Sequence, residues 1–364
     1  MYQLSQIYLL SLLIFSLTGC SGIHYYQQAV TGQMTLLWDR TPIEDVLDDP
    51  ATDEALQQKL NLAIKARQFA GDNLALPVDG TFSSYVELNR PYVVYNLVIA
   101  PRFSLAPQQW CYPVIGCQAY RGFFHLEDAQ EEMSGYPSDE YDRFIGGGSA
   151  YSTLGWFDDP LHSGFTNLPD DRMVALIFHE LAHKVVYVDG DTTFNESFAT
   201  TVELEGLKRW LIAEGQPETY SHAKVRWQRR RDTIQLVEQT SEQLNRLYQA
   251  TDTLPEQTLM ARKQALLEAL KTDYAALETR WGEPGPLGGL VDQADNAIIG
   301  LLKQYNGDVP AFQQLLKDSN GDFLVFFEKV RALAELDAEP RRQQLDNLRS
   351  RQTEPAEVMI RPDA

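Results

Sequence analysis

A short pattern of two histidines and a glutamate constrains this chain more than any other feature. His179 and His183 stand four residues apart, and Glu180 follows the first of them. On a helix, residues four apart share one face, so these two imidazoles can bind one metal ion. The surrounding residues are apolar on nearly every side of such a helix, which places it in a core. Buried histidines and a buried carboxylate need partners, and a metal ion supplies them.

Glu180 is the candidate catalytic base of this pattern. One residue after the first histidine, it projects near the open side of the metal, where it can take a proton from a bound water. The alternative is a buried helix whose histidines only satisfy backbone groups. That alternative gives no reason for the Asn195–Glu196 pair, which follows at a spacing that could place Glu196 beside the histidines.

A third ligand is expected from the next helix, because zinc in hydrolytic sites usually takes three protein ligands and a water. A turn at residues 189–190 would fold a second helix back on the first and place Glu196 opposite the histidines. Glu203 is the runner-up, since it lies seven residues later on roughly the same face. Imidazole and carboxylate ligands together favour Zn²⁺.

The start of the chain predicts a lipid anchor. The apolar run from Leu9 to Leu17 is too short for an ordinary membrane span, and it leads into Thr-Gly and then Cys20. This pattern is typical of a bacterial lipoprotein signal peptide, so we expect residues 1–19 to be removed and Cys20 to be lipidated. Residues 1–7 carry no Lys or Arg, which departs from the pattern and leaves an ordinary secretory peptide or a short anchor as the alternative.

Charge and cysteine content limit the partners and the compartment. The net charge of −20 disfavours nucleic acid, which is bound by clustered Lys and Arg. After Cys20, only Cys111 and Cys117 remain, and in an oxidising periplasm we expect them to form a disulfide. Metal binding by this pair is the alternative, but no His or Cys partners of zinc-ribbon spacing stand nearby.

The remaining pattern predicts a small sheet ahead of the metal helices and a helical part after them. Before the pattern we expect helices at 24–39, 54–70 and 127–142, and strands at 84–88, 92–99, 112–115 and 118–124. A glycine-rich loop at 146–149 would lead into an edge strand at 150–155. After the ligand helix, which we expect to run to residue 213, we expect a helical hairpin at 222–250 and 255–281 and short helices at 292–305, 310–318 and 322–335.

The predicted organisation has four parts. Residues 1–19 are the signal peptide, 20–213 an α+β zinc-binding catalytic part, 214–337 a helical part, and 338–364 a charged flexible tail. His162 falls in a turn before the metal helix, where we expect a solvated side chain.

Several blocks of this sequence resemble the aminopeptidase lipoproteins of Gram-negative bacteria, within the zincin peptidases of the Glu-ligand type. The resemblance rests on residues 179–183, 191–199, 150–156, 117–124 and 25–29. It implies a zincin-like α+β fold, with a small mixed or antiparallel sheet beside the metal helices, and aminopeptidase activity. An Asn-Glu pair with a small residue three positions later recurs in the class, which favours Glu196 over Glu203.

The resemblance also implies roles outside the metal helices. Zinc peptidases commonly align the substrate backbone on an exposed strand edge, which makes Tyr151, Ser152 and Thr153 candidate substrate-binding residues; the alternative is an ordinary packed strand. Many members use a Tyr or His from a later helix to stabilise the oxyanion, and Tyr305 is the candidate here, against a simply packed tyrosine. The non-acidic Ser21 suggests, by similarity to lipoprotein sorting, the inner leaflet of the outer membrane, facing the periplasm.

Together these features predict a zinc metallopeptidase that hydrolyses peptides in the periplasm, with Glu180 as general base. The aminopeptidase assignment comes from the resemblance, and an endopeptidase remains open. The rival is a lipoprotein that binds or scaffolds partners and keeps zinc as a structural pin. A structural site would not need Glu180 or an open coordination position. The sequence does not define the oligomeric state.

Overall fold

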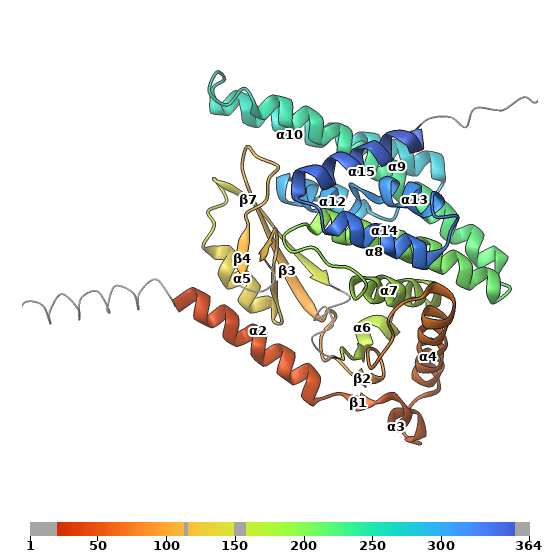
Figure 1. The fold of residues 1–364 in the computed structure, drawn as a ribbon. Helices are drawn as coiled ribbons and strands as arrows, with labels where there is room; N and C mark the ends of the chain where they lie inside the picture. The colour runs from red at the N-terminus through yellow and green to blue at the C-terminus, as the bar shows by residue number, and fades with distance from the viewer. Residues whose placement is uncertain (1–19, 113–115, 149–157, 354–364) are drawn as a thin grey trace, which may run out of the picture.

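The histidine pattern lies on α7 (Asp170–His183), which packs against α8 (Thr192–Ala213), the helix that carries Glu196. The computed structural model describes residues 20–112, 116–148 and 158–353 and places these helices near the middle of the molecule (Figure 1). α7 begins with Asp170 and Asp171, whose charges complement the helix dipole. Asp191 caps α8 by accepting a hydrogen bond from the backbone N–H of Phe194 at 3.1 Å. The predicted signal peptide and Tyr151, Ser152 and Thr153 lie outside the described residues.

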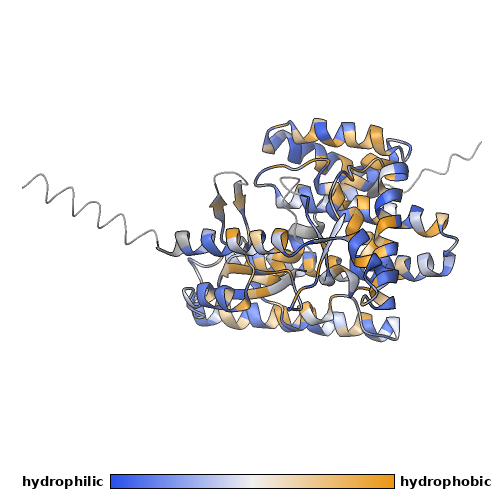
Figure 2. Cartoon of the chain, turned by 90° about the horizontal axis from the view of Figure 1, so that it is seen from below, coloured by the Kyte–Doolittle hydropathy of each residue, from blue (hydrophilic) through white to orange (hydrophobic). Residues whose placement is uncertain are grey.

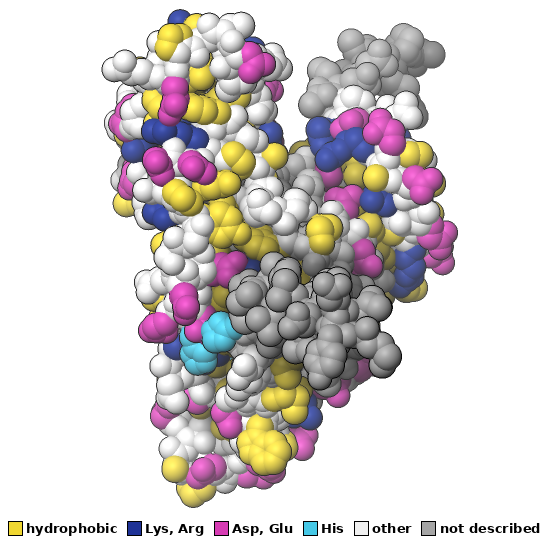
Figure 3. Space-filling model, turned by 90° about the vertical axis from the view of Figure 1, so that its left-hand side faces the viewer, with side chains coloured by type: hydrophobic (Ala, Val, Ile, Leu, Met, Phe, Trp, Pro, Cys, Tyr) yellow, Lys and Arg dark blue, Asp and Glu magenta, His cyan; other side chains and the backbone are white. Residues whose placement is uncertain are grey.

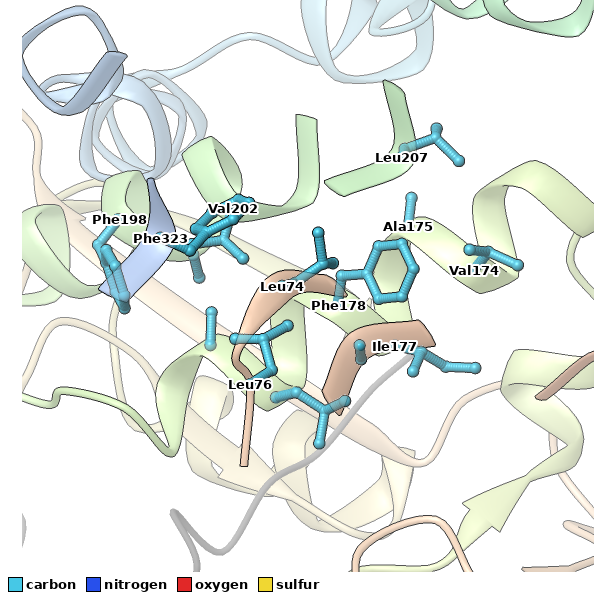
Figure 4. Close-up of a cluster of buried hydrophobic side chains, with 14 of the residues drawn as sticks. Leu74, Leu76, Val174, Ala175, Ile177, Phe178, Phe198, Val202, Leu207 and Phe323 are labelled. Atoms are coloured by element: carbon cyan, nitrogen blue, oxygen red, sulfur yellow. The ribbon is translucent and has the colours of Figure 1, made fainter. Parts of the chain in front are cut away.

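Apolar packing fixes the two helices in the largest core of the described residues. Phe178 on α7 is fully buried between α8 and α4 (Glu54–Leu74). Gly206 on α8 permits this approach, because a Cβ there would lie 2.9 Å from the Phe178 ring and 3.0 Å from Leu74. Figure 4 shows Phe178 next to Leu74 of α4 and Ala175 of α7, with Leu207 of α8 above them. The same core reaches Phe312 and Leu345, so it joins residues on both sides of position 213.

A three-stranded antiparallel sheet lies beside these helices, in the order β6-β3-β7. Its strands are β3 (Val94–Pro101), β6 (Arg121–Phe123) and β7 (Tyr141–Gly148). A smaller mixed sheet contains β1 (Thr41–Pro42), β2 (Ser84–Val86) and β8 (Leu161–His162), in which β2 and β8 are parallel. β4 (Trp110–Tyr112) and β5 (Gly116–Gln118) pair as a hairpin, and a disulfide joins Cys111 to Cys117.

The prediction for residues 127–149 was partly wrong. Helix α5 (Leu126–Ser134) is shorter than expected, and residues 141–148 form β7 instead of the end of a helix and a loop. Gly146 and Gly147 of β7 are required by packing, because aromatic rings lie against them. A Cβ at Gly147 would lie 2.3 Å from the Tyr92 ring, and one at Gly146 would lie 2.8 Å from the Phe144 ring.

The remaining helices cover the outside of these layers (Figure 1). α9 (Pro217–Tyr248) and α10 (Glu256–Trp281) pack together as the expected hairpin. The other helices are α2 (Cys20–Trp38), α3 (Ile43–Asp48), α6 (Ser163–Thr166), α11 (Gly288–Asp292), α12 (Asn296–Asn306), α13 (Val309–Lys317), α14 (Phe323–Ala334) and α15 (Ala338–Thr353). The described part of the chain is therefore α+β and mostly helical. None of its helices is both long enough and apolar enough to cross a membrane.

Helix α15 corrects the prediction of a flexible tail from residue 338. Leu345 and Leu348 are buried against the core. Arg341 is also buried, and its Nε donates to Asp191 Oδ2 at 3.0 Å. Because Asp191 caps α8, this ion pair connects the end of the described chain to the start of α8. Two leucines among many charged residues gave too weak a periodic pattern to predict a packed helix.

His162 is buried rather than solvated. Its side chain is 2% exposed, and its Nδ1 accepts a hydrogen bond from Gly164 N–H at 3.1 Å, which caps α6. Burial, and then the charge of Arg90, lower the pKa of His162 to about 3. The imidazole is therefore neutral in the folded protein and protonates readily only in the unfolded chain.

This difference predicts a loss of stability in acid. The pKa of His162 is lower in the folded state than in the unfolded state. Its contribution to the free energy of unfolding is therefore complete above about pH 6.5 and is lost progressively as the pH falls toward 3. Replacing His162 with Asn, which keeps a capping acceptor, should reduce the loss of unfolding free energy between about pH 7.5 and about pH 5 by about 2 kcal/mol. Urea denaturation of both proteins at the two pH values measures this difference. Equal losses of unfolding free energy in both proteins would contradict a buried, neutral His162 as the source of the acid sensitivity.

Candidate metal centre

His179, His183 and Glu196 converge on one point between α7 and α8. The Nε2 atoms of the two histidines are 3.3 Å apart. Glu196 places Oε2 3.3 Å from His179 Nε2 and Oε1 3.8 Å from His183 Nε2. One ligand atom from each of the three residues lies within 4.8 Å of the others. The last turn of α7 and the start of α8 thus provide a three-residue group that could hold a metal ion.

The loop between the two helices is fixed by Asn195. Its amide donates to Val188 C=O at 2.8 Å and accepts from Val188 N–H at 2.8 Å. Gly190 in the same loop has a φ of +75°, a conformation that favours glycine. The residue before Glu196 therefore sets the turn that brings the carboxylate opposite the histidines.

Glu203 lies on the other side of the His179 ring and is not one of the three converging residues. Its Oε2 is 3.1 Å from His179 Nδ1. A proton on Nδ1 donated to this carboxylate leaves the Nε2 lone pair directed at Glu196 and His183. Burial raises the pKa of Glu203, but its hydrogen bond to His179, the charge of His179, and those of Arg230 and Arg172 outweigh this effect and lower it. Glu203 is thus charged and suited to orient His179.

The three converging groups fit a divalent metal ion. With Nδ1 of His179 donating to Glu203, its Nε2 presents a lone pair next to His183 Nε2 and the Glu196 carboxylate, and a divalent cation could accept one lone pair from each of the three residues. A proton partly fills this role: burial lowers the pKa of His179, but its hydrogen bonds to Glu196 and Glu203 raise it well above the ordinary value. A metal ion would replace that proton and satisfy all three ligands at once.

Glu180 lies beside the group without belonging to it. The pKa of Glu180 is raised to about 7: burial raises it most, the charge of His179 lowers it, and the charges of Glu196, Asp159 and Glu203 raise it. A carboxyl with a pKa near neutrality can both accept and return a proton. A bound cation would favour the charged, proton-accepting form.

These residues line a large cleft of about 2310 Å³. Its walls include the metal helices, the glycine end of β7, the neighbouring strand β3, and parts of α2 and α9. β7 pairs only with β3 among the described strands, so it is an edge of the described sheet, and its residues 144–148 line the cleft. Figure 3 shows a hollow between two lobes on the face that it presents.

Tyr120 also lines the cleft and was not predicted from the sequence. Burial, and then the charges of Glu196, Tyr187 and Glu180, raise the pKa of its phenol, so it is a neutral hydrogen-bond donor near the candidate site. Its position depends on the disulfide hairpin: Gly116 packs against the α7–α8 loop, where a Cβ would lie 3.2 Å from the backbone nitrogen of Gly190. No local sequence pattern predicts this tertiary contact. Tyr305 lies on α12, but its side chain is outside the described part of the structure.

The sequence matches a known protein family over residues 24–345, a range that includes α7, α8 and all the described strands. The family is described as "Putative aminopeptidase". The chain belongs to this family. No curated protein and no solved structure matches the chain. Membership in the "Putative aminopeptidase" family supports peptidase activity, and a peptidase acts on peptide substrates.

Proposed function

We propose that the protein is a zinc-dependent peptidase of the aminopeptidase type, with a zincin-like arrangement of its metal helices. The observation that carries the proposal is the convergence of His179, His183 and Glu196 in a cleft that also contains Glu180. Two imidazoles, one carboxylate and a neighbouring glutamate form the ligand set and base of a hydrolytic zinc centre. Family membership supports the peptide as the substrate.

Each residue of the site has a separate role in the proposed hydrolysis. When bound, Zn²⁺ would polarise the scissile carbonyl and acidify the attacking water. Glu180 accepts the proton of that water and passes it to the nitrogen of the leaving amine. Glu203 holds the His179 ring in one orientation through Nδ1. The edge of β7 that has no partner among the described strands can align an extended peptide along the cleft by strand addition.

Tyr120 is the residue that we propose to stabilise the developing oxyanion. Tyr120 lines the cleft, and its neutral phenol lies close enough to Glu196 and Glu180 for their charges to raise its pKa. Replacing Tyr120 with Phe removes the donor and keeps the ring, so we expect kcat to fall by about 10²-fold with little change in KM. Steady-state kinetics on one peptide substrate measure the effect. Tyr187 provides a matched Tyr→Phe control in the same cleft. Its hydroxyl accepts a hydrogen bond from Gln118 Nε2 at 3.2 Å. Equal effects of the two replacements would contradict the role of Tyr120.

The compartment proposed for this reaction is the periplasm. The cleavage pattern ending at Cys20 supports a lipid anchor, and the absence of an acidic residue at position 21 supports the inner leaflet of the outer membrane. The Cys111–Cys117 disulfide is consistent with an oxidising compartment. Metabolic labelling with a fatty acid in wild type and Cys20→Ala tests the anchor, and label retained in the variant would contradict it.

Paired peptides test the type of peptidase. Two peptides of identical sequence, one with a free amino terminus and one acetylated, are incubated with the zinc-loaded protein and followed by mass spectrometry. An aminopeptidase releases the first residue of the free peptide and leaves the acetylated peptide intact. Internal cleavage of both peptides would replace the aminopeptidase assignment with an endopeptidase.

A further inference from the structure

Helix α2 carries an exposed apolar stripe that the peptidase site does not explain. Tyr26, Val30, Met34 and Trp38 follow one another at intervals of four residues, which keeps them near one side of the helix. Their exposed fractions are 46%, 61%, 51% and 86%. A tryptophan exposed to this degree on a regular helix is unusual, because large aromatic side chains are highly buried on average.

The opposite side of α2 is anchored to the protein. Gln28 donates to Gly122 C=O at 3.3 Å and accepts from Phe124 N–H at 3.0 Å. Gly32 lies so close to the Phe124 ring that a Cβ would come within 2.1 Å of it, and Leu36 is buried. Figures 1 and 2 both show α2 along the outside of the molecule. The helix is therefore a fixed part of the fold with one apolar side turned outward.

The charge of α2 sets it apart from the rest of the chain. Its 19 residues contain no Asp, Glu, Lys or Arg, although 23% of the chain is charged and a segment of this length would carry about four such residues. Acidic side chains are spread over the face in Figure 3, in keeping with the net charge of −20. α2 is thus a surface where the protein can approach a lipid bilayer without dehydrating charged groups or adding to repulsion from anionic lipids.

We propose that the stripe of Tyr26, Val30, Met34 and Trp38 binds the surface of a lipid bilayer, with α2 lying in the plane of the interface. Helices of this kind bury their apolar side at the boundary between headgroups and acyl chains, where Trp and Tyr are favoured. The position of α2 in the chain supports the bilayer as the partner. The helix starts at Cys20, the residue that carries the proposed lipid anchor, so that anchor would hold the first turn of α2 at the bilayer.

This contact would also orient the peptidase site. Val30 and Met34 belong to the lining of the cleft that contains Glu180. A bilayer held against the stripe brings this end of the cleft to the membrane surface. The contact itself does not depend on peptidase activity, so each proposal can fail without the other.

Flotation with lipid vesicles tests the proposal. The chain that begins at Ser21 cannot carry the lipid and keeps all the described side-chain packing. Val30→Gln/Met34→Gln removes half of the stripe. Ile212→Gln/Leu324→Gln is the matched control, because these side chains are 60% and 64% exposed elsewhere. With phosphatidylcholine vesicles, we expect wild type and control to float and the stripe variant to lose at least tenfold in partitioning, an order-of-magnitude estimate from two apolar side chains. An added anionic lipid should weaken binding.

Two further measurements separate the alternatives. The emission difference between wild type and Trp38→Phe isolates Trp38, and its maximum should move to shorter wavelength when vesicles are added. Failure of wild type to float, or equal flotation of both double variants, would overturn the proposal. Sedimentation that shows a dimer lost only in the stripe variant, without vesicle binding, would assign the stripe to a second copy. If the stripe variant lost affinity for peptide but still bound vesicles, the stripe would be assigned to substrate binding.

Discussion

Replacing Glu180 with Gln is expected to lower kcat for peptide hydrolysis by about 10²- to 10⁴-fold while the bound zinc is retained. The amide preserves the shape of the side chain but cannot accept the proton of the attacking water. Glu180 is not one of the three converging ligands, so the metal content should stay at one ion per chain. Steady-state kinetics and metal analysis on the same samples measure both quantities.

Glu205→Gln is the matched control for this experiment. Glu205 lines the same cleft on α8, but it pairs with Lys208 at 2.9 Å and with Arg209 at 3.0 Å, away from the histidines. We expect its replacement to leave kcat within a few-fold of wild type, because partly exposed ion pairs of this kind contribute little. Equal activity of Glu180→Gln and wild type would eliminate Glu180 as the base. Zinc in both proteins with cleavage by neither would favour the scaffold alternative.

Replacing Glu196 or Glu203 with Ala should give clearly different losses of zinc. Glu196 faces both Nε2 atoms, so Glu196→Ala removes one of three ligands and should abolish zinc retention and hydrolysis together. Glu203 contacts only Nδ1 of His179, and loss of such an orienting carboxylate typically weakens metal affinity by about 10- to 100-fold. Competition with a zinc-binding dye measures both affinities. A larger loss in Glu203→Ala than in Glu196→Ala would make Glu203 the third ligand.

The elements that the sequence predicted well are those with strong local patterns. α7 is apolar around its histidines, and α8 starts with a capping Asp191 followed by an apolar series, so both helices and the turn between them could be expected. The ranking of Glu196 above Glu203 followed from the Asn-Glu pair. The structure adds a physical reason, since Asn195 fixes the loop that turns α8 back toward α7.

The elements that the sequence missed depend on contacts between distant residues. Glycines at 146–148 suggest a loop, but these residues pair with β3, and the rings of Tyr92 and Phe144 lie against Gly147 and Gly146. α15 was not predicted, because its burial depends on two leucines and on the pairing of Arg341 with Asp191, 150 residues away. Tyr120 reaches the cleft through docking of a disulfide hairpin, which no periodicity encodes.

The most direct test of a metallopeptidase is reversible loss of cleavage when zinc is removed. The full-length protein, loaded with zinc, is mixed with a library of peptides that have free amino termini, and products are identified by mass spectrometry. A chelator is then added, and zinc is restored to the same sample. We predict cleavage that stops with the chelator and returns with zinc. Cleavage that continues after zinc has been removed, or no cleavage of any peptide by the zinc-loaded protein, would contradict the account.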